Sequence, residues 1–228
     1  MPSKSLVVFD LDGTLVDTAP DLSAAMNVIL SREGLGELAP ASVRLMVGRG
    51  ARVLMERGLE AAGIVPDSAR LDRLVDEFLA VYEQRIALES RPFPGAIEAV
   101  EALASNGARL AICTNKPERL SELLLGELGI REHFVSLIGG DSLMRRKPFA
   151  EPLLEAIARA GCTPAETVMV GDSVTDIQTA RAAGVRVVGV SFGYSETAMA
   201  DLGADAVIDH FDELGPALAK LGMRASST

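Results

Sequence analysis

Residues 7–14 read Val-Val-Phe-Asp-Leu-Asp-Gly-Thr, and this stretch decides both the fold and the chemistry that we expect. An apolar strand leads into Asp10 and Asp12. Because side chains two residues apart in a strand point to the same side, the two carboxylates should leave the strand together. Carboxylates so close together repel each other unless a cation lies beside them or they share a proton. A divalent metal meets this need, although an ordinary acidic turn is the alternative.

From residue 91 onward, short β-branched runs alternate with amphipathic stretches, which is typical of a parallel sheet covered by helices on both faces. The expected strands are Leu6–Leu11, Arg109–Thr114, Val135–Gly139, Thr167–Gly171, Val185–Val190 and Ala206–Ile208. Helices are expected between them at Gly95–Ser105, Glu118–Leu128, Pro152–Ala160 and Val174–Ala183. We therefore predict an α/β fold with a doubly wound, mainly parallel, six-stranded Rossmann-like core.

The stretch between residues 20 and 90 has helical periodicity and no convincing strand. Helices are expected at Asp21–Arg32, Pro40–Met46, Ala51–Ala62 and Ser68–Leu88. We predict an inserted all-helical cap domain over residues 17–91, with residues 1–16 and 92–228 forming the catalytic core. Such a domain could close over the first acidic motif and exclude water. The alternative is that these helices pack onto the sheet as part of one domain.

The composition narrows the class of partner. The chain has 228 residues and a formal net charge of -10, which argues against nucleic acid and anionic membranes as partners. The stretch from Met1 to Ser5 is too short and too polar for a signal peptide, and no apolar run approaches the roughly 20 residues of a membrane helix. We expect a cytoplasmic monomer or homodimer. The two cysteines, Cys113 and Cys162, lack metal-ligand spacing, and Cys113 should be a buried packing residue.

Polar residues follow other predicted strands, where ligands bind in an open parallel sheet. Thr114 and Asn115 come directly before a helix, so a hydroxyl, an amide and free helix N–H groups could hold an anion there. The same residues are also ordinary helix caps. Further on, residues 145–148 read Arg-Arg-Lys-Pro, and a lysine held at a helix start can face a phosphate. Basic residues in a loop are otherwise solvated.

A second acidic group follows the fourth predicted core strand. Asp172 and Asp176 are four residues apart, which places them on one face of the helix that begins there. Acidic residues favour helix N-termini, but a cap needs only one carboxylate. Oxygen ligands without histidine or cysteine nearby suit Mg²⁺, which is often held by one or two carboxylates and a substrate phosphate.

With these four motifs in this order, the chain resembles the haloacid dehalogenase-like superfamily of aspartyl-phosphate hydrolases over nearly its full length. The resemblance implies that Asp10 is the nucleophile that accepts the phosphoryl group. It implies that Asp12 protonates the leaving alkoxide and then activates the water that hydrolyses the aspartyl phosphate. Thr114 and Lys147 match phosphate-binding positions, and only the resemblance favours Lys147 over the two arginines before it.

The resemblance also implies the metal ligands. Mg²⁺ would be held by Asp10, the backbone carbonyl of Asp12, and Asp172. Asp176 would act through water or by positioning Lys147. No other cofactor is expected.

Two segments are similar to those of bacterial phosphoglycolate phosphatases. They are residues 12–22, Asp-Gly-Thr-Leu-Val-Asp-Thr-Ala-Pro-Asp-Leu, and residues 139–143, Gly-Gly-Asp-Ser-Leu. The implied function is Mg²⁺-dependent hydrolysis of a small anionic phosphomonoester, 2-phosphoglycolate, through an aspartyl phosphate on Asp10. Phe149 and Ala150 stand where those enzymes often have His-Pro. This departure leaves another small phosphorylated metabolite, such as a sugar phosphate or pyrophosphate, as an alternative substrate.

Other classes fit less well. Dehalogenases and phosphonatases of the superfamily lack the second aspartate, and β-phosphoglucomutase-like phosphomutases typically carry a histidine where this chain has Leu22. A signalling receiver also phosphorylates an aspartate at a strand end, but it has no helical insertion and gives Asp12 no role. An inactive binding protein is disfavoured because no motif residue is missing.

In this superfamily the cap largely selects the substrate, which draws attention to the predicted cap loop at residues 47–52, Val-Gly-Arg-Gly-Ala-Arg. Its glycines allow close approach, and Arg49 is suited to bidentate capture of a substrate carboxylate. The alternative is a surface arginine between two helices.

Overall fold

A six-stranded parallel sheet forms the centre of the molecule, and the computed structural model describes residues 5–223. The sheet order is β5-β4-β1-β6-β7-β8, with β1 (Leu6–Phe9) between β4 (Arg109–Cys113) and β6 (Thr167–Gly171). The remaining strands are β5 (Ser136–Ile138), β7 (Arg186–Val190) and β8 (Ala206–Ile208). Every neighbouring pair is parallel. The predicted six strands and fold class are confirmed.

Helices cover both faces of this sheet because β1 alternates its buried side chains between two hydrophobic clusters. Val7 and Phe9 face one cluster, while Leu6 and Val8 face the other. The helices of the core are α5 (Ala96–Ser105), α6 (Glu118–Glu127), α7 (Glu151–Arg159), α8 (Val174–Ala182) and α9 (Leu214–Lys220). Side chains of α5, α6 and α9 belong to the first cluster, and those of α7 and α8 belong to the second. Cys113 is fully buried in the second cluster, as expected.

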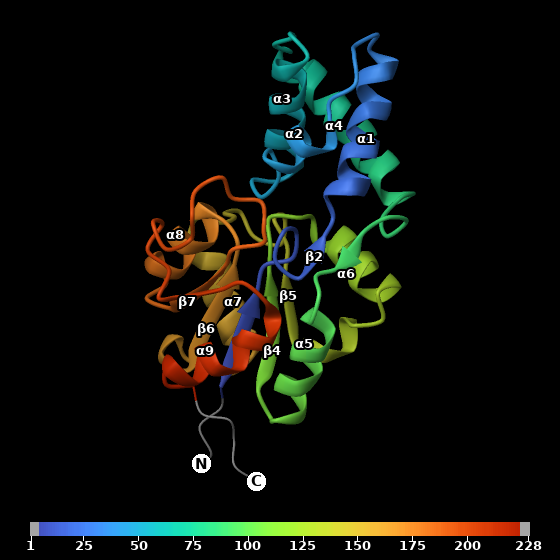
Figure 1. Ribbon diagram of the computed structural model, residues 1–228. Helices are drawn as coiled ribbons and strands as arrows, with labels where there is room; N and C mark the ends of the chain where they lie inside the picture. The colour runs from blue at the N-terminus through green and yellow to red at the C-terminus, as the bar shows by residue number, and fades with distance from the viewer. Residues whose placement is uncertain (1–4, 224–228) are drawn as a thin grey trace.

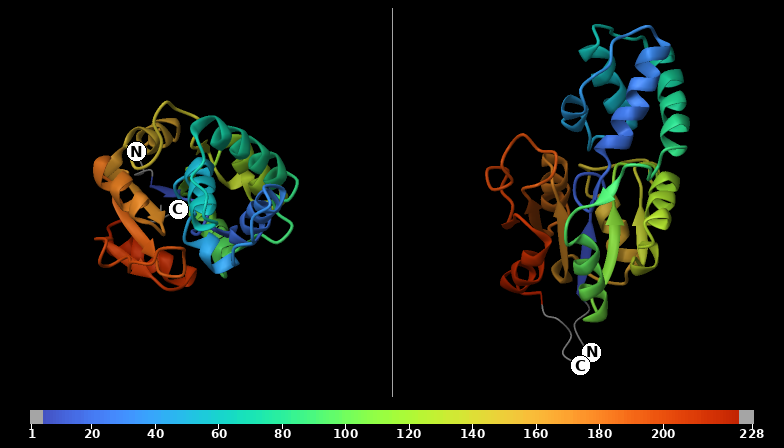
Figure 2. Two further views of the ribbon diagram at one scale, coloured as in Figure 1. Left: turned by 90° about the horizontal axis from the view of Figure 1, so that it is seen from above. Right: turned by 45° about the vertical axis from the view of Figure 1, so that its right-hand side comes forward.

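A second group of helices lies beyond the carboxyl ends of the strands (Figure 1). These are α1 (Ala19–Arg32), α2 (Pro40–Arg44), α3 (Ala51–Ala61) and α4 (Ser68–Glu83), which pack on one another. Figure 2 shows this group and the sheet from two further directions. Short 3-10 helices occur at Arg131–His133, Pro164–Glu166 and Phe211–Glu213. No helix within residues 5–223 has the length and apolarity needed to cross a membrane.

The chain enters and leaves this helical group through two neighbouring segments. β2 (Val16–Asp17) pairs antiparallel with β3 (Arg91–Pro92), so the two connections run side by side. This ribbon was not predicted, because a pairing of two residues leaves no periodic pattern in the sequence.

Helix α4 ends at Glu83, five residues before the predicted end at Leu88. The following segment makes turns instead, and the carboxylate of Asp21 from α1 holds its far end. Asp21 Oδ2 accepts hydrogen bonds from the backbone N–H groups of Glu89 and Ser90, at 2.9 and 2.8 Å, and from the Ser90 hydroxyl at 2.8 Å. The helix therefore stops early because the returning chain is fixed to α1.

Candidate active site

The end of β1 places Asp10 at the centre of a buried polar group. Asp10 is 3% exposed, its backbone N–H donates to the Val170 carbonyl of β6 at 2.9 Å, and its carboxylate accepts from the Leu11 N–H at 2.7 Å. The chain then turns at Gly13, whose φ is 85°. A Cβ on Gly13 would lie 2.5 Å from Asp172 Oδ2, so only glycine lets the turn pass this carboxylate.

Lys147 is the cation beside Asp10. Its Nζ lies 2.9 Å from Asp10 Oδ1 and 2.6 Å from Asp176 Oδ1, and its side chain is fully buried. Burial by itself lowers the pKa of Lys147, but the charges of Asp10 and Asp176 outweigh it and hold the pKa above its usual value. Arg145 and Arg146, by contrast, are exposed. Lys147 is thus the basic residue of this loop that the fold directs inward.

The two acidic residues after β6 have different partners. Asp172 accepts hydrogen bonds from the Thr14 hydroxyl at 3.0 Å and from the Tyr194 N–H at 2.7 Å. Asp176 accepts from the backbone N–H and hydroxyl of Ser173 at 3.1 and 2.6 Å, and so caps the start of α8. Asp176 therefore stabilises the helix end and orients Lys147 at the same time.

Asp10, Asp172 and Asp176 form a group that fits a divalent cation. Each offers a carboxylate oxygen, and these oxygens lie within 4.8 Å of one another. Burial raises the pKa of Asp10 to about 8 and that of Asp172 to about 7. When all three carboxylates are ionised, one lysine leaves an excess of negative charge, which a divalent ion with oxygen ligands would balance.

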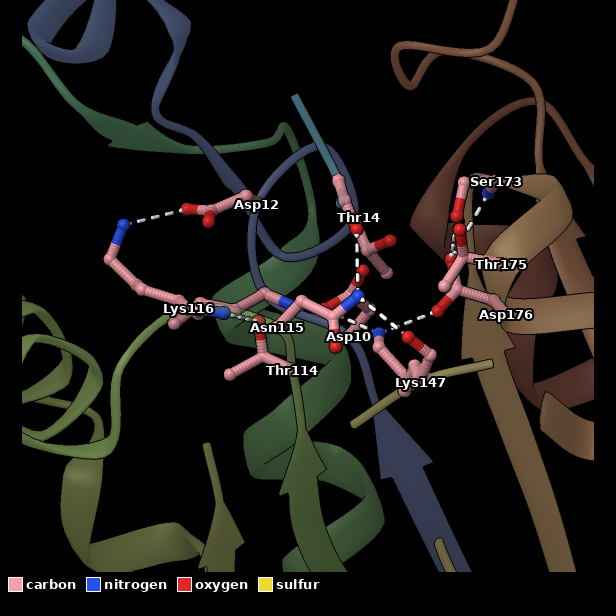
Figure 3. A network of polar contacts seen from close by, with 12 residues as sticks. Asp10, Asp12, Thr14, Thr114, Asn115, Lys116, Lys147, Ser173, Thr175 and Asp176 are labelled. Atoms are coloured by element: carbon pink, nitrogen blue, oxygen red, sulfur yellow. Dashed lines mark hydrogen bonds and ion pairs between the residues drawn. The ribbon is translucent and has the colours of Figure 1, made fainter. Parts of the chain in front are cut away.

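The side chain of Asp12 points away from that group. Its Oδ1 accepts hydrogen bonds from the Thr18 hydroxyl at 2.7 Å and from Lys116 Nζ at 3.0 Å. Figure 3 shows the separation, with Lys116 and Asp12 on one side and Lys147, Asp10 and Asp176 on the other. The carboxylates of Asp10 and Asp12 thus have different environments, and the side chain of Asp12 lies outside the group formed by Asp10, Asp172 and Asp176.

The turn after β4 brings two further predicted residues beside Asp10. The Thr114 hydroxyl accepts from the Lys116 N–H at 3.2 Å. The side-chain amide of Asn115 donates to two carbonyls, that of Gly48 at 3.1 Å and that of Lys147 at 3.2 Å. Asn115 therefore joins the loop before α3 to the loop that carries Lys147, and an anion would meet its backbone N–H rather than its amide.

A pocket lies between the polar residues around Asp10 and the group of helices α1–α4. Asp10, Asp12, Thr114, Asn115 and Lys116 line its floor. Apolar and aromatic side chains of the helical group line the opposite wall, among them Leu22, Val47, Leu54, Phe78, Leu79 and Tyr82. Four of the predicted core-site residues therefore line this pocket, and Lys147, Asp172 and Asp176 lie beside Asp10 outside its lining.

The predicted cap residue Arg49 is placed differently. It is exposed, and it is not among the residues that line the pocket. Its neighbours Gly48 and Gly50 line the pocket instead.

A family model described as haloacid dehalogenase-like hydrolase matches residues 7–190. The chain belongs to this family. This hydrolase is 49% identical to the phosphoglycolate phosphatase of Caulobacter vibrioides, over 90% of its own chain and 86% of that protein. It is 45% identical to the phosphoglycolate phosphatase of Mesorhizobium japonicum, over 98% and 99% of the two chains. A solved structure of a predicted phosphoglycolate phosphatase from Haemophilus somnus matches with a TM-score of 0.88 and 32% identity, covering 95% and 98%.

Sequence reasoning missed two residues that this haloacid dehalogenase-like hydrolase places at its site. Lys116 stands within the Thr-Asn-Lys-Pro turn, but only its neighbours received a role. Tyr194 lies in the loop after β7, donates its N–H to Asp172, and accepts the N–H groups of Thr18 and Ala19 on its hydroxyl at 2.8 and 3.0 Å. The rule that ligands gather at strand ends, applied to β7 as well, would have found this loop.

Proposed function

We propose that this chain is a Mg²⁺-dependent phosphatase that hydrolyses 2-phosphoglycolate through an aspartyl phosphate on Asp10. The observation that carries the proposal is the pairing of buried Asp10 with Lys147 at 2.9 Å, while Asp12 turns its carboxylate away into the pocket. One carboxylate is then placed to attack and the other to exchange protons. The names of the relatives described above support the choice of substrate.

The proposed chemistry has two displacements. A carboxylate oxygen of Asp10 attacks phosphorus, the bond from phosphorus to the glycolate oxygen breaks, and Asp12 gives its proton to that leaving oxygen. Asp12 then accepts a proton from a water that attacks the aspartyl phosphate, which releases phosphate and restores Asp10. Lys147, Thr114 and the backbone N–H of Asn115 would stabilise the charge on the phosphoryl oxygens.

The proposed metal ligands are Asp10, the backbone carbonyl of Asp12, and Asp172, with Asp176 positioning Lys147. The all-oxygen donor set suits Mg²⁺, as it suits other hard divalent ions. When bound, the ion would neutralise charge on the phosphoryl group and offset the repulsion between the carboxylates.

We further propose that residues 17–91 act as a cap domain on a core of residues 1–16 and 92–228. Both connections meet in the β2–β3 ribbon, and the apolar side chains of α1, α3 and α4 form the pocket wall opposite Asp10. A cap placed in this way would exclude bulk water during phosphoryl transfer.

The alternatives are weaker on the same geometry. A sugar phosphate or pyrophosphate would use the same core residues, so the choice between these substrates and 2-phosphoglycolate rests on the pocket wall. A phosphomutase would need a proton-transferring side chain on that wall, whereas buried Leu22 offers none. The substrate proposal is tested by a phosphate-release screen over small phosphorylated metabolites. A clear preference for a different phosphoester would overturn the substrate and leave the mechanism standing.

The nucleophile is tested with Asp10→Asn. We expect phosphate release from 2-phosphoglycolate to fall roughly 10³-fold or more, because the amide is a poor nucleophile. The matched control is Asp201→Asn, an exposed aspartate far along the chain, which should keep wild-type turnover. Circular dichroism and thermal melting would verify that both variants fold. Substantial turnover by folded Asp10→Asn contradicts the assignment.

A further inference from the structure

Lys116 occupies a position in the pocket that the proposed mechanism leaves without a task. Within residues 5–223 it is the one cationic side chain that lines the pocket between the core and helices α1–α4. The pocket wall contributed by the helices is otherwise apolar, apart from the hydroxyl of Tyr82. Lys147 does not line this pocket and lies between two carboxylates, those of Asp10 and Asp176, whereas Lys116 contacts one, that of Asp12.

The surroundings of Lys116 are those of a cation held ready for an anion. Its side chain is 2% exposed, and a buried ammonium is costly unless oxygen acceptors surround it. Its Nζ donates to Asp12 Oδ1 at 3.0 Å and to the Tyr82 hydroxyl at 2.6 Å, and lies 4.3 Å from the centre of the Tyr82 ring. An ammonium has three hydrogens, so one remains for a further acceptor.

Tyr82 supplies a second donor beside it. The Tyr82 oxygen accepts from Lys116, and the hydroxyl hydrogen has no acceptor among the residues that the structure describes. Tyr82 is 1% exposed overall, and it reaches the pocket from α4. Two donors, one charged and one neutral, therefore lie side by side in an apolar enclosure, an arrangement that a carboxylate can satisfy with its two oxygens.

The location of this pair relative to the reaction identifies which part of a substrate it would contact. Lys116 lies beside Asp12, on the side away from Lys147 and Asp176 (Figure 3). Asp12 is the group proposed to give a proton to the leaving oxygen, so Lys116 lies on the leaving-group side. In 2-phosphoglycolate the carboxylate is one methylene from that oxygen, which brings it within reach of a group that touches Asp12.

We propose that Lys116, with Tyr82, recognises the carboxylate of the leaving group and so selects phosphoesters of short α-hydroxy acids. This inference rests on the proposed phosphatase function and deepens it. Lys116 joins the core, where Asp12 acts, to α4 of the proposed cap, where Tyr82 lies. Selection would then depend on both parts being in place, because neither donor alone completes the carboxylate site.

The test compares two substrates that differ only in the carboxylate. 2-Phosphoglycolate and 2-hydroxyethyl phosphate have the same phosphate and the same methylene, and the second has a neutral hydroxymethyl group. The quantity measured is the ratio of kcat/KM for the two substrates. In the wild type we expect this ratio to favour 2-phosphoglycolate.

Lys116→Met keeps the length and apolar stem of the side chain but removes the charge. Because a hydrogen bond to a charged group is lost, the ratio should fall roughly 10- to 100-fold, mainly through a higher KM for 2-phosphoglycolate. A disturbance of Asp12 lowers activity on both substrates together, so a merely structural role of Lys116 leaves the ratio unchanged. Tyr82→Phe retains the ring and should lower the ratio about several-fold, which keeps the test available if Lys116→Met folds poorly.

Two further variants serve as controls. Lys220→Met removes an exposed lysine on α9 and should leave the ratio at the wild-type value. Arg49→Met tests the residue that the sequence suggested for carboxylate capture. A ratio that falls in Arg49→Met and persists in Lys116→Met and Tyr82→Phe overturns the inference and leaves the proposed function intact. A wild type without preference for 2-phosphoglycolate overturns the proposed substrate, and the carboxylate site with it.

Discussion

At the residue scale, two glycines determine where Asp172 can lie. A Cβ on Gly13 would be 2.5 Å from Asp172 Oδ2, and one on Gly193 would be 2.2 Å from Asp172 Cβ. The glycines come from the turn after β1 and the loop after β7, so two distant segments enclose the same carboxylate. The position of this proposed metal ligand is therefore set as much by the absence of a side chain at Gly13 and Gly193 as by its hydrogen bonds.

Gly193→Ala should displace Asp172 and weaken metal binding. We expect the Mg²⁺ concentration for half-maximal activity to rise roughly tenfold or more, as is common when groups that orient a metal ligand change. A titration of phosphate release against Mg²⁺ measures it. The control is Gly215→Ala on α9, where an added Cβ has no heavy atom within 4 Å. Equal Mg²⁺ requirements in the two variants would contradict the role assigned to Gly193.

At the element scale, Asp21 connects the first turn of α1 to the segment that returns to the core. Its carboxylate is fully buried and accepts three hydrogen bonds from Glu89 and Ser90, which lie 68 and 69 residues later. The sequence predicted helix α1 but no task for this residue, because its partners follow the unexpectedly early end of α4.

Asp21→Ala should destabilise the protein by about 3 kcal/mol, because it removes three hydrogen bonds and leaves the buried N–H of Ser90 without its acceptor. Chemical denaturation measures the change in the free energy of unfolding. Asp76→Ala is the control, since Asp76 is exposed on α4 and its loss should cost less than about 0.5 kcal/mol. Similar losses of unfolding free energy in both variants would show that the Asp21 hydrogen bonds do not hold the segment that returns to the core.

Elements with strong periodicity could be predicted, whereas those set by distant contacts could not. The six strands of the core followed from β-branched runs, and the eight predicted helices followed from apolar spacing. The β2–β3 ribbon escaped prediction because each strand has two residues. At the site, residues that directly follow β1, β4 and β6 were found, because chain position alone places them at one edge of the sheet. Lys116 and Tyr194 also follow strands, β4 and β7, but their roles depend on contacts with Asp12 and Asp172, which chain position does not give.

At the scale of the whole molecule, buried carboxyl groups couple stability to pH and to metal. Burial raises the pKa of Asp10 to about 8 and that of Asp172 to about 7, from an ordinary value of 3.8. In the metal-free protein the native state therefore keeps protons that the unfolded chain releases between about pH 4 and 8. The native state binds more protons in this window, so its stability decreases as pH rises through it.

A divalent ion needs the ionised carboxylates, so its binding should strengthen over the same window. We expect saturating Mg²⁺ to raise the melting temperature more at pH 8 than at pH 6, as measured by calorimetry. Removal of metal with EDTA should abolish phosphate release, and added Mg²⁺ should restore it. Asp172→Asn should show a smaller dependence of the Mg²⁺ effect on pH, because only one of the two titrating ligands, Asp10, remains. An equal rise at both pH values in the wild type would contradict this coupling.

The antiparallel β2–β3 ribbon determines what kind of segment can connect its two strands. Neighbouring strands lie about 5 Å apart, so the ends of the segment between Asp17 and Arg91 are also that close. The sheet therefore tolerates an insertion of any size between β2 and β3, provided that the two ends of the insertion lie close together. On the proposed division into cap and core, a shorter loop or an unrelated domain with neighbouring termini could be grafted onto the ribbon, leaving the sheet and its cluster of aspartates in place.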